Sequence, residues 1–403
     1  MVELIHHKPF SIKEIQAMSK PTTVLGNLLS HFPRSEFEKA VQELGGDKRV
    51  RSFSSFDMVK TLLYGQLRGA FSVREIESSL VAHGSELYHA GMKPVRRSTL
   101  CDALEKRNPA IFEKAFQALV FKAQQLSSKS GRRFRNPLRV IDASTIEVCL
   151  ARFDWAKFRT TKGAVKLHVC LDGDHCFPQQ VRITTGAVHE VRELSALSQE
   201  GGMIYVVDRG YVDFKRLHDI DLSMSTFVTR MKDNCQYDHV TVQSFSQTGP
   251  IRFDAKVRLT GEKAQKDYPE PIRKVNYHDE ETNRDYQFMT NNFDLEAQEV
   301  AEIYKARWQV ELFFKWIKQN LKIRTFWGTS RNAVFTQLWV ALIVFMLLWI
   351  SKTVDAVAAS PQRILQLLKT LLLARRSFLD LFRDPAPPHP VDTLQLSLLG
   401  FRN

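Results

Sequence analysis

The chain has 403 residues, and its 57 Lys and Arg outnumber its 44 Asp and Glu, so it carries a formal net charge of +13. This length favours two or three domains, and 44% hydrophobic residues with only 15 Pro exclude wholesale disorder. Counting along the sequence places about +10 of the charge before residue 141. This asymmetry predicts a polyanion-binding N-terminal part, although charge alone does not separate nucleic acid from a membrane surface.

Cysteine usage and the N-terminus bear on the compartment. The five cysteines are scattered and form no Cys-x-x-Cys motif, which argues against a disulfide framework or a zinc ribbon. The first residues lack a basic stretch followed by an apolar run, so we expect no signal peptide. Both observations favour the reduced cytoplasm.

One apolar run raises the question of a membrane. Residues 338–350 are unbroken apolar, but about 13 residues are fewer than the 18 or more that a spanning helix needs. We therefore expect a buried core helix and no membrane partner, with a membrane segment as the alternative.

The first 130 residues predict an all-α region, because apolar residues recur there every three or four positions. A capping box begins one short helix at Ser72. Farther on, Arg96 and Arg97 stand just before Ser98 and Thr99, where we expect a Ser or Thr cap to begin another helix. Arginines at a helix N-terminus suit phosphate contact, so this region is either a helix-turn-helix-like DNA reader or a small bundle with a solvated basic rim.

After a polar, basic linker at 127–137 the pattern changes to that of a mixed α/β sheet. The first three strands should form an antiparallel meander, and the apolar fourth strand should lie at the centre of the sheet. The expected strands are 138–148, 165–171, 179–185 and 203–208, with a helix at 190–198.

The second half predicts an insertion followed by helices. Residues 231–291 alternate like strands and show no good helix, so we expect a β-rich insertion. One long helix is expected over 295–320, capped by Asp294. The expected domains are 1–130, helical and DNA-binding; 131–350, catalytic, with the insertion; and 351–403, a helical tail that either forms a dimer interface or packs on the catalytic core.

Three carboxylates stand where chemistry is expected. Asp142 lies in the first strand, Asp208 ends the apolar fourth strand, and Glu311 lies on the long helix. Two carboxylates side by side at strand ends demand a cation, and hard oxygen ligands select Mg²⁺ or Mn²⁺. A pair of such ions serves in-line phosphoryl transfer. Taken singly, each residue has an ordinary alternative as a turn cap, an ion-pair partner or a solvated helix residue.

The helix that carries Glu311 strengthens the catalytic hypothesis. At 100° per residue, Tyr304, Arg307, Glu311, Lys315 and Lys318 share one face. The functional interpretation is a metal ligand flanked by phosphate binders. The ordinary alternative is an amphipathic helix with an i,i+4 pair between Glu311 and Lys315. Residues 322–331 then interleave basic and aromatic side chains, as stacking on nucleic acid requires.

These residues carry a resemblance to a known family. The spacing Tyr304-x-x-Arg307-x-x-x-Glu311, with Lys318 seven residues later, resembles the Tyr-Arg-Glu-Lys signature of DDE transposases from the "family four" group of bacterial insertion sequences. Residues 140–145 and 208–213 resemble the blocks around that family's two aspartates. The basic stretch 227–234, with Arg230, resembles the segment that opens the family's insertion.

The resemblance implies a ribonuclease-H-like catalytic fold in which Asp142, Asp208 and Glu311 hold two Mg²⁺, with Mn²⁺ as a substitute. It implies cleavage of transposon ends and their joining to target DNA. DNA would be contacted by Tyr304, Arg307, Trp308, Lys315, Lys318, Arg230, Arg96 and Arg97. Trp308 matches a position that holds a flipped base in members that excise through a hairpin, but no second Trp lies between Arg209 and Val300.

The implied partners are the double-stranded terminal inverted repeats and the target DNA, bound by a homodimer in a bacterial cytoplasm near the nucleoid. Two alternatives remain open from the sequence. One is another ribonuclease-H-fold nuclease, such as a resolvase. The other is an inactive DNA-binding repressor from a decayed element.

Overall fold

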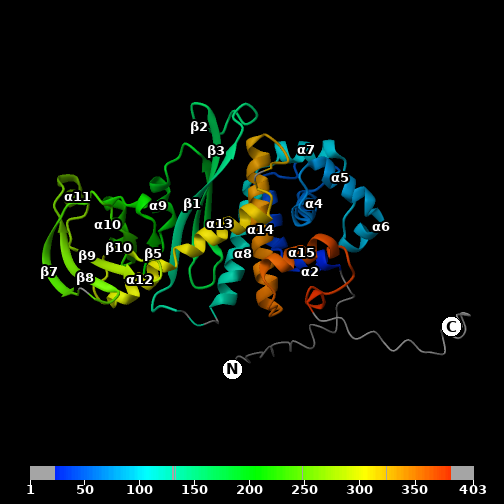
Figure 1. The fold of residues 1–403 in the computed structure, drawn as a ribbon. Coiled ribbons are helices and arrows are strands. Elements are labelled where there is room, and N and C mark those ends of the chain that lie inside the picture. The colour runs from blue at the N-terminus through cyan, green and yellow to red at the C-terminus, as the bar shows by residue number, and fades with distance from the viewer. Residues whose placement is uncertain (1–22, 129–130, 132, 247, 324, 383–403) are drawn as a thin grey trace, which may run out of the picture.

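The computed structural model describes residues 23–128, 131, 133–246, 248–323 and 325–382, which form a mixed α/β protein with a large sheet and many helices (Figure 1). The helices are α2 (Val24–Ser30), α3 (Arg34–Glu43), α4 (Ser55–Arg68), α5 (Val73–Ala82), α6 (Gly84–Leu87), α7 (Arg97–Lys106), α8 (Ala110–Ser127), α9 (Glu190–Leu197), α10 (Phe214–Leu222), α11 (Glu262–Asp267), α12 (Ala297–Lys305), α13 (Trp308–Asn320), α14 (Arg331–Val354) and α15 (Pro361–Leu371). Short 3₁₀ turns are η1 (Tyr88–Ala90), η2 (Arg209–Tyr211) and η3 (Leu379–Leu381). The strands are β1 (Leu138–Val148), β2 (Lys157–Arg159), β3 (Lys162–Asp172), β4 (Pro178–Thr185), β5 (Ile204–Val207), β6 (Thr226–Arg230), β7 (Tyr237–Phe245), β8 (Ile251–Leu259), β9 (Ile272–Asp279) and β10 (Arg284–Thr290).

The sheet has the order β2-β3-β1-β5-β6-β10-β9-β8-β7, and β4 pairs with β3. The expected meander is confirmed, because β1, β3 and β4 pair antiparallel. The expected central strand is also confirmed, since β5 lies between β1 and β6 and is parallel to both. The residues of β5 are buried, as a strand covered on both faces requires.

The β-rich segment continues this sheet. Strand β10 pairs antiparallel with β6, and β9, β8 and β7 follow outward. The expectation that this segment contains no helix is wrong, because α11 lies between β8 and β9. Helix α11 has six residues and no buried side chain, so it lacks the apolar periodicity that would have predicted it.

The single helix expected over 295–320 is also wrong, because the chain breaks it into α12 and α13. At the break, the amide of Ala306 donates to the carbonyl of Ile303 and the amide of Arg307 to that of Tyr304, a three-residue spacing tighter than the α-helix. Helix α12 begins after Glu296, so Asp294 is not its cap. The break places Tyr304 on α12 and Glu311 on α13.

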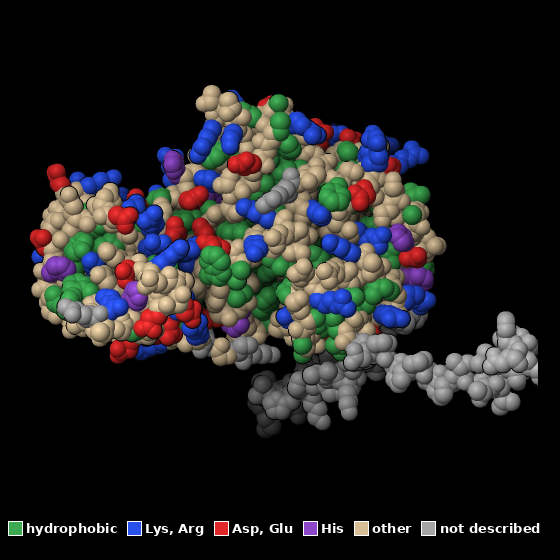
Figure 2. Space-filling view, in the orientation of Figure 1, with side chains coloured by type: hydrophobic (Ala, Val, Ile, Leu, Met, Phe, Trp, Pro, Cys, Tyr) green, Lys and Arg blue, Asp and Glu red, His purple; other side chains and the backbone are tan. Residues whose placement is uncertain are grey.

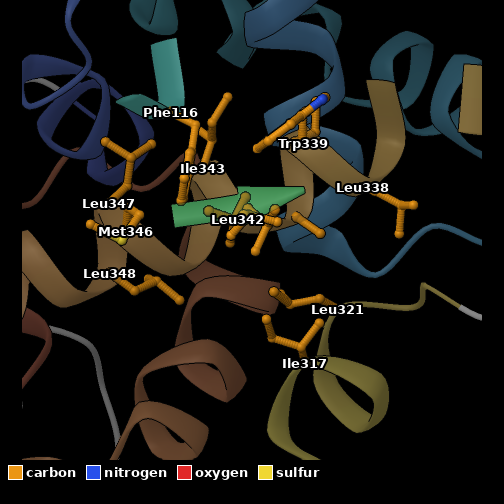
Figure 3. Packing of buried hydrophobic residues seen from close by; sticks show 14 of the residues in the cluster. Phe116, Ile317, Leu321, Leu338, Trp339, Leu342, Ile343, Met346, Leu347 and Leu348 are labelled. Carbon is orange, nitrogen blue, oxygen red and sulfur yellow. The ribbon is translucent and has the colours of Figure 1, made fainter. Parts of the chain in front are cut away.

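Helices cover both faces of the sheet. On β5, Tyr205 and Val207 point to the core under α9 and α10, whereas Ile204 and Val206 point to the larger core. Helices α8, α12, α13 and α14 contribute to that larger core. Figure 3 shows its centre, where residues of α14 such as Leu342 lie between Phe116 and Ile317.

Helix α14 is the apolar helix expected from the sequence. It is long and apolar enough to cross a membrane by composition, with a mean hydropathy of 2.3, yet 83% of its apolar stretch is buried inside the protein. This burial agrees with the core-helix interpretation.

Helices from the two ends of the chain pack together on the far side of α14 (Figure 1). The amides of Val24 and Leu25 donate to the carbonyls of Ala374 and Leu372 at 3.0 and 2.8 Å. Trp327 Nε1 donates to the carbonyl of Ala70 at 3.0 Å. The tail helix α15 therefore lies on α4 and α14.

The caps of two N-terminal helices differ from each other. Ser72 caps α5 as expected, accepting from the amide of Glu75, but the expected capping box is incomplete because the Glu75 carboxylate accepts from the amide of Phe71 and not from that of Ser72. Helix α7 begins one residue before Ser98 and has Arg96 at its N-cap, with no side-chain cap bond, so the expected Ser or Thr cap is wrong. The amide of Arg97 donates instead to Glu77, whose carboxylate takes over the role of the cap.

Candidate active site

Two of the three expected carboxylates meet at neighbouring strands. Strands β1 and β5 run parallel with Ile141 opposite Val207, so the next residues, Asp142 and Asp208, lie side by side. Neighbouring strands are about 4.8 Å apart. The sequence prediction that strand order brings these aspartates together agrees with this register.

Asp142 is held in a partly buried position. Its side chain is 18% exposed, and its Oδ1 accepts from the amide of Ala143 at 2.7 Å. Burial raises the pKa of Asp142 to about 6, while the Ala143 amide and Arg307 act in the opposite direction. The nearby charge of Asp208 raises the pKa further, so a cation at this position would relieve both costs.

Asp208 directly follows β5 and caps the turn η2, where its Oδ2 accepts from the amide of Gly210 at 3.4 Å. Its other oxygen accepts from the phenol of Tyr304 at 3.4 Å. The Tyr304 ring packs against Phe288 with centroids 4.8 Å apart. Helix α12 and the insertion strand β10 therefore both position the second aspartate.

Arg307 links the helix carboxylate to the strand carboxylates. Its Nη2 lies 2.7 Å from Oε1 of Glu311, and its Nη1 lies 3.9 Å from Oδ2 of Asp142. Burial alone would lower the pKa of Arg307, but the bond to Glu311 and nearby negative charges raise it overall. The partner of Glu311 is thus Arg307, one turn earlier, in place of Lys315.

The lysines of α13 line a cleft beside these carboxylates. Lys318 Nζ donates to the carbonyl of Thr145 on β1 at 3.1 Å, which ties α13 to the strand that carries Asp142. Lys315 is exposed. The cleft has a volume of about 380 Å³ and is lined by Asp142, Ala143, Ser144, Glu311, Phe314, Lys315, Lys318 and Gln319. Figure 2 shows acidic side chains between α9 and α13, with Lys and Arg around them.

Arg230 lies on the other side of Asp208. It ends β6, whose Thr229 is opposite Val207, so Arg230 follows the same register as Asp208. Its guanidinium stacks 5.2 Å from the ring centroid of Tyr286. The sheet therefore places Arg230, one of the expected DNA contacts, next to Asp208.

The remaining expected DNA contacts lie apart from this centre. Trp308 begins α13 and is 58% exposed. Arg96 and Arg97 are exposed at the start of α7, across α14 from α13 (Figure 1). Stacking by Trp327 is a wrong expectation, because that side chain is 7% exposed and its Nε1 is bonded to Ala70.

The donor set fits a divalent cation by its chemistry. Asp142, Asp208 and Glu311 offer hard oxygen atoms in a partly buried place, which suits Mg²⁺ or Mn²⁺. Among the described residues, no three or more His, Cys, Asp or Glu side chains lie close enough together to hold a metal ion as they stand. The guanidinium of Arg307 lies among these carboxylates.

Some lining residues were not expected from the sequence. Ser144 and Gln319 line the cleft, and Thr145 offers its carbonyl to Lys318. The sequence shows small residues after Asp142, but which face of the sheet they line depends on the strand register. Phe288 supports Tyr304 from the insertion, and no local pattern joins residues so far apart.

Comparison with known proteins identifies the class. The family described as "Transposase DDE domain" matches residues 133–347, more than half of the chain, and a domain of unknown function, DUF4372, matches residues 20–93. The chain belongs to the DDE transposase family. It is an enzyme that cleaves and transfers DNA, and the family implies dependence on a divalent metal.

Individual relatives agree with this assignment. A probable transposase for insertion sequence element IS5377 of Geobacillus stearothermophilus is 28% identical over 82% of this chain and 85% of its own length. The Sinorhizobium fredii protein y4zB, provisionally described as a transposase, is 33% identical over 72% of this chain and 81% of its own. A piggyBac transposase synaptic complex with hairpin DNA gives a TM-score of 0.47 at 11% identity, covering 94% of this chain and 85% of that one, a likeness too weak to support an argument. The chain is thus a transposase of the insertion-sequence type, and the resolvase and repressor alternatives are not favoured.

Proposed function

We propose that Asp142, Asp208 and Glu311 are the catalytic carboxylates and that together they hold two Mg²⁺, or Mn²⁺ in their place. The observation that carries the proposal is the register of β1 and β5, which sets Asp142 beside Asp208. Helix α13 carries Glu311, and Arg307 links Glu311 to Asp142 because its guanidinium lies within 4 Å of both carboxylates. Two such ions, when bound, would stabilise charge on the attacking and leaving oxygens of a phosphoryl transfer.

The surrounding side chains would position the DNA. Arg307 has the planar guanidinium that binds a phosphate through two hydrogen bonds, and it lies within 4 Å of both Glu311 and Asp142. Lys315 and Lys318 line the same cleft and supply point charges for neighbouring phosphates. Tyr304 would keep Asp208 oriented through its phenol. Trp308 is exposed enough to stack on a base.

The finer family assignment belongs to the same proposal. The spacing of Tyr304, Arg307, Glu311 and Lys318 supports membership of the Tyr-Arg-Glu-Lys group. The order β4-β3-β1-β5-β6, with β1, β5 and β6 parallel, supports a ribonuclease-H-like core extended by the insertion β7–β10.

The assembly proposal concerns the rest of the chain. The N-terminal helices, with Arg96 and Arg97, would bind the terminal inverted repeats, and 131–350 would form the catalytic domain. Synapsis of two ends would require a homodimer. We infer action in the bacterial cytoplasm, at the nucleoid, because the substrate is genomic DNA.

The test uses duplexes that carry the ends of the element encoding this chain. The variants Asp142→Asn, Asp208→Asn and Glu311→Gln keep the size of each side chain and remove its charge. Each should reduce Mg²⁺-dependent cleavage and strand transfer at least about 1,000-fold, a loss typical of removing a principal electrostatic contribution. Binding of the ends in a gel-shift assay should persist. Cleavage near the wild-type rate in any of the three would overturn the assignment of that residue.

A further inference from the structure

A basic β-hairpin projects from the sheet beyond the carboxylates. It is formed by β2 and the start of β3, with Lys157 opposite Gly163 and Arg159 opposite Lys162. The hairpin rises above the body of the protein at the top of the view (Figure 1). Neither the metal-binding proposal nor the N-terminal DNA-binding proposal uses it.

The base of this hairpin is firmly packed. Trp155 Nε1 donates to the carbonyl of Thr329 at 2.8 Å, and its ring meets Phe335 edge-on with centroids 5.9 Å apart. Phe153 is buried and meets Phe326 in the same way. The hairpin is therefore held at a fixed angle by the segment that leads into α14.

One face of the hairpin packs on the sheet. The side chain of Phe158 lies so close to Gly186 that a Cβ there would come within 2.8 Å of it. Lys157 and Arg159 flank Phe158 at a bulge in the strand, and the Arg159 guanidinium lies over the Phe158 ring, 5.1 Å from its centroid. Both are exposed, as is Lys162.

Among the residues that the structure describes, no carboxylate forms an ion pair with Lys157, Arg159 or Lys162. Arg159 and Lys162 are also paired directly across the strands, and like charges in that position destabilise a hairpin. An anion bound between these two side chains would remove that repulsion. Figure 2 shows Lys and Arg side chains on this projection.

The position of the hairpin relative to the carboxylates suits a DNA duplex. Val169 is the strand partner of Asp142, and Gly163 and Lys162, opposite Lys157 and Arg159, are six and seven residues away along the same segment. At about 3.3 Å per residue, the three basic residues stand about 20–23 Å from Asp142. Because one turn of B-DNA is about 34 Å, a duplex along this edge would present them with phosphates about six to seven base pairs from the carboxylates.

We propose that this hairpin is a DNA-binding arm whose Lys157, Arg159 and Lys162 bind backbone phosphates about six to seven base pairs from the scissile phosphate. The proposal rests on the transposase function and adds a contact surface to it. The phosphates could belong to the transposon end or to the target duplex. Because a phosphate has the same chemistry in both duplexes, the experiment has one arm for the transposon end and one for the target.

The test compares two triple variants of the full chain. The hairpin variant is Lys157→Gln, Arg159→Gln and Lys162→Gln, and the matched control is Lys215→Gln, Lys263→Gln and Lys266→Gln. The control residues are exposed lysines on α10 and α11, and they change the net charge by the same amount. Circular dichroism and thermal unfolding check that both variants fold.

The first arm measures binding of transposon ends as a function of salt. Duplexes extend either about 20 base pairs or about 5 base pairs past the cleavage site. Three lost phosphate contacts should reduce the slope of log K against log salt by about 2.7 for the long duplex, with little change for the short one. Phosphate ethylation interference should lose a signal about six to seven base pairs from the cleavage site.

The second arm measures joining of precleaved ends to a plasmid. If the target duplex is bound, the hairpin variant should leave end binding unchanged and need at least about tenfold more target for half-maximal joining. The proposal is overturned if both the salt slope and the target dependence of the hairpin variant match those of the control. That result would leave the carboxylate assignment intact, because Asp142→Asn tests it separately through cleavage.

Discussion

The guanidinium of Arg307 lies 2.7 Å from the carboxylate of Glu311, and this contact brings a positive charge in among the proposed metal ligands. The same guanidinium is 3.9 Å from Asp142. Arg307 therefore offsets the negative charge of the carboxylates when they hold no metal ion. Once a metal ion offsets that charge, the guanidinium can bind a phosphate. A single arginine would thus serve two states of the site.

The first prediction concerns Arg307→Gln. Without the guanidinium, the neighbouring carboxylates repel one another, so the melting temperature in the presence of a chelator should fall. Addition of Mg²⁺ should then raise the melting temperature more than it does in the wild type, because the cation no longer competes with the arginine. Differential scanning calorimetry with and without Mg²⁺ measures both effects.

A suitable control is Arg133→Gln. Arg133 is also paired with a helix carboxylate, Glu302, but lies at the surface, with its side chain 59% exposed. Its loss should cost little and leave the Mg²⁺ effect at the wild-type value. Equal Mg²⁺ effects in the wild type and Arg307→Gln would contradict the proposed competition.

The second prediction separates the two roles of Tyr304. Tyr304→Phe removes the bond to Asp208 but keeps the ring against Phe288, so stability should change by less than about 1 kcal/mol. Cleavage should nevertheless slow, because Asp208 loses an orienting partner. Tyr304→Ala also empties a buried place and should cost about 3–5 kcal/mol of unfolding free energy. Urea unfolding and single-turnover cleavage distinguish the two variants, and full activity of Tyr304→Phe would count against the orienting role.

Much of the candidate site was predictable because the relevant patterns are local. An apolar strand that ends in Asp208 and a helical face that carries Arg307 and Glu311 can be read within short windows. Strand order in a mixed sheet made it possible that Asp142 and Asp208 meet, but the register that sets them side by side comes from the structure.

Other features depend on tertiary contacts and gave no local signal. The break at Ala306 interrupts a continuous helical pattern, and it places Tyr304 on one helix and Glu311 on the next. The insertion appeared as a separate β-rich unit, whereas β10 joins it edge to edge to β6. The aromatic residues of 322–331 looked available for stacking, but Trp327 is buried against the N-terminal helices.

The third prediction contrasts two tryptophans. Trp327→Ala should cost about 3–5 kcal/mol of unfolding free energy, because the side chain is buried and its Nε1 is bonded to the Ala70 carbonyl. Trp308→Ala should change stability by no more than about 0.5 kcal/mol, since that side chain is 58% exposed. Trp308→Ala should instead impair a DNA-processing step after binding. If Trp327→Ala keeps the stability of the wild type but loses DNA binding, the result would favour stacking of Trp327 on DNA and contradict this prediction.

The last prediction concerns His168, which lies on β3 with its side chain inside the protein. Its Nε2 is 2.8 Å from the hydroxyl of Thr184, and its Nδ1 has no hydrogen-bond partner among the described residues. Burial lowers the pKa of His168 to about 4, and the nearby charges of Lys166 and Arg182 lower it too, against the effect of Glu193. The unfolded chain has the ordinary value of about 6.5 and therefore binds a proton more readily than the folded chain between pH 6.5 and 4. Stability that is fully present above pH 6.5 should be lost as the pH falls toward 4, by about 3 kcal/mol from this residue. Urea unfolding at pH 7.5, 5.5 and 4.5 should show a smaller loss for His168→Gln than for the wild type, because glutamine does not titrate. A stability difference between the two proteins that stays constant over this range would show that His168 does not contribute to acid sensitivity.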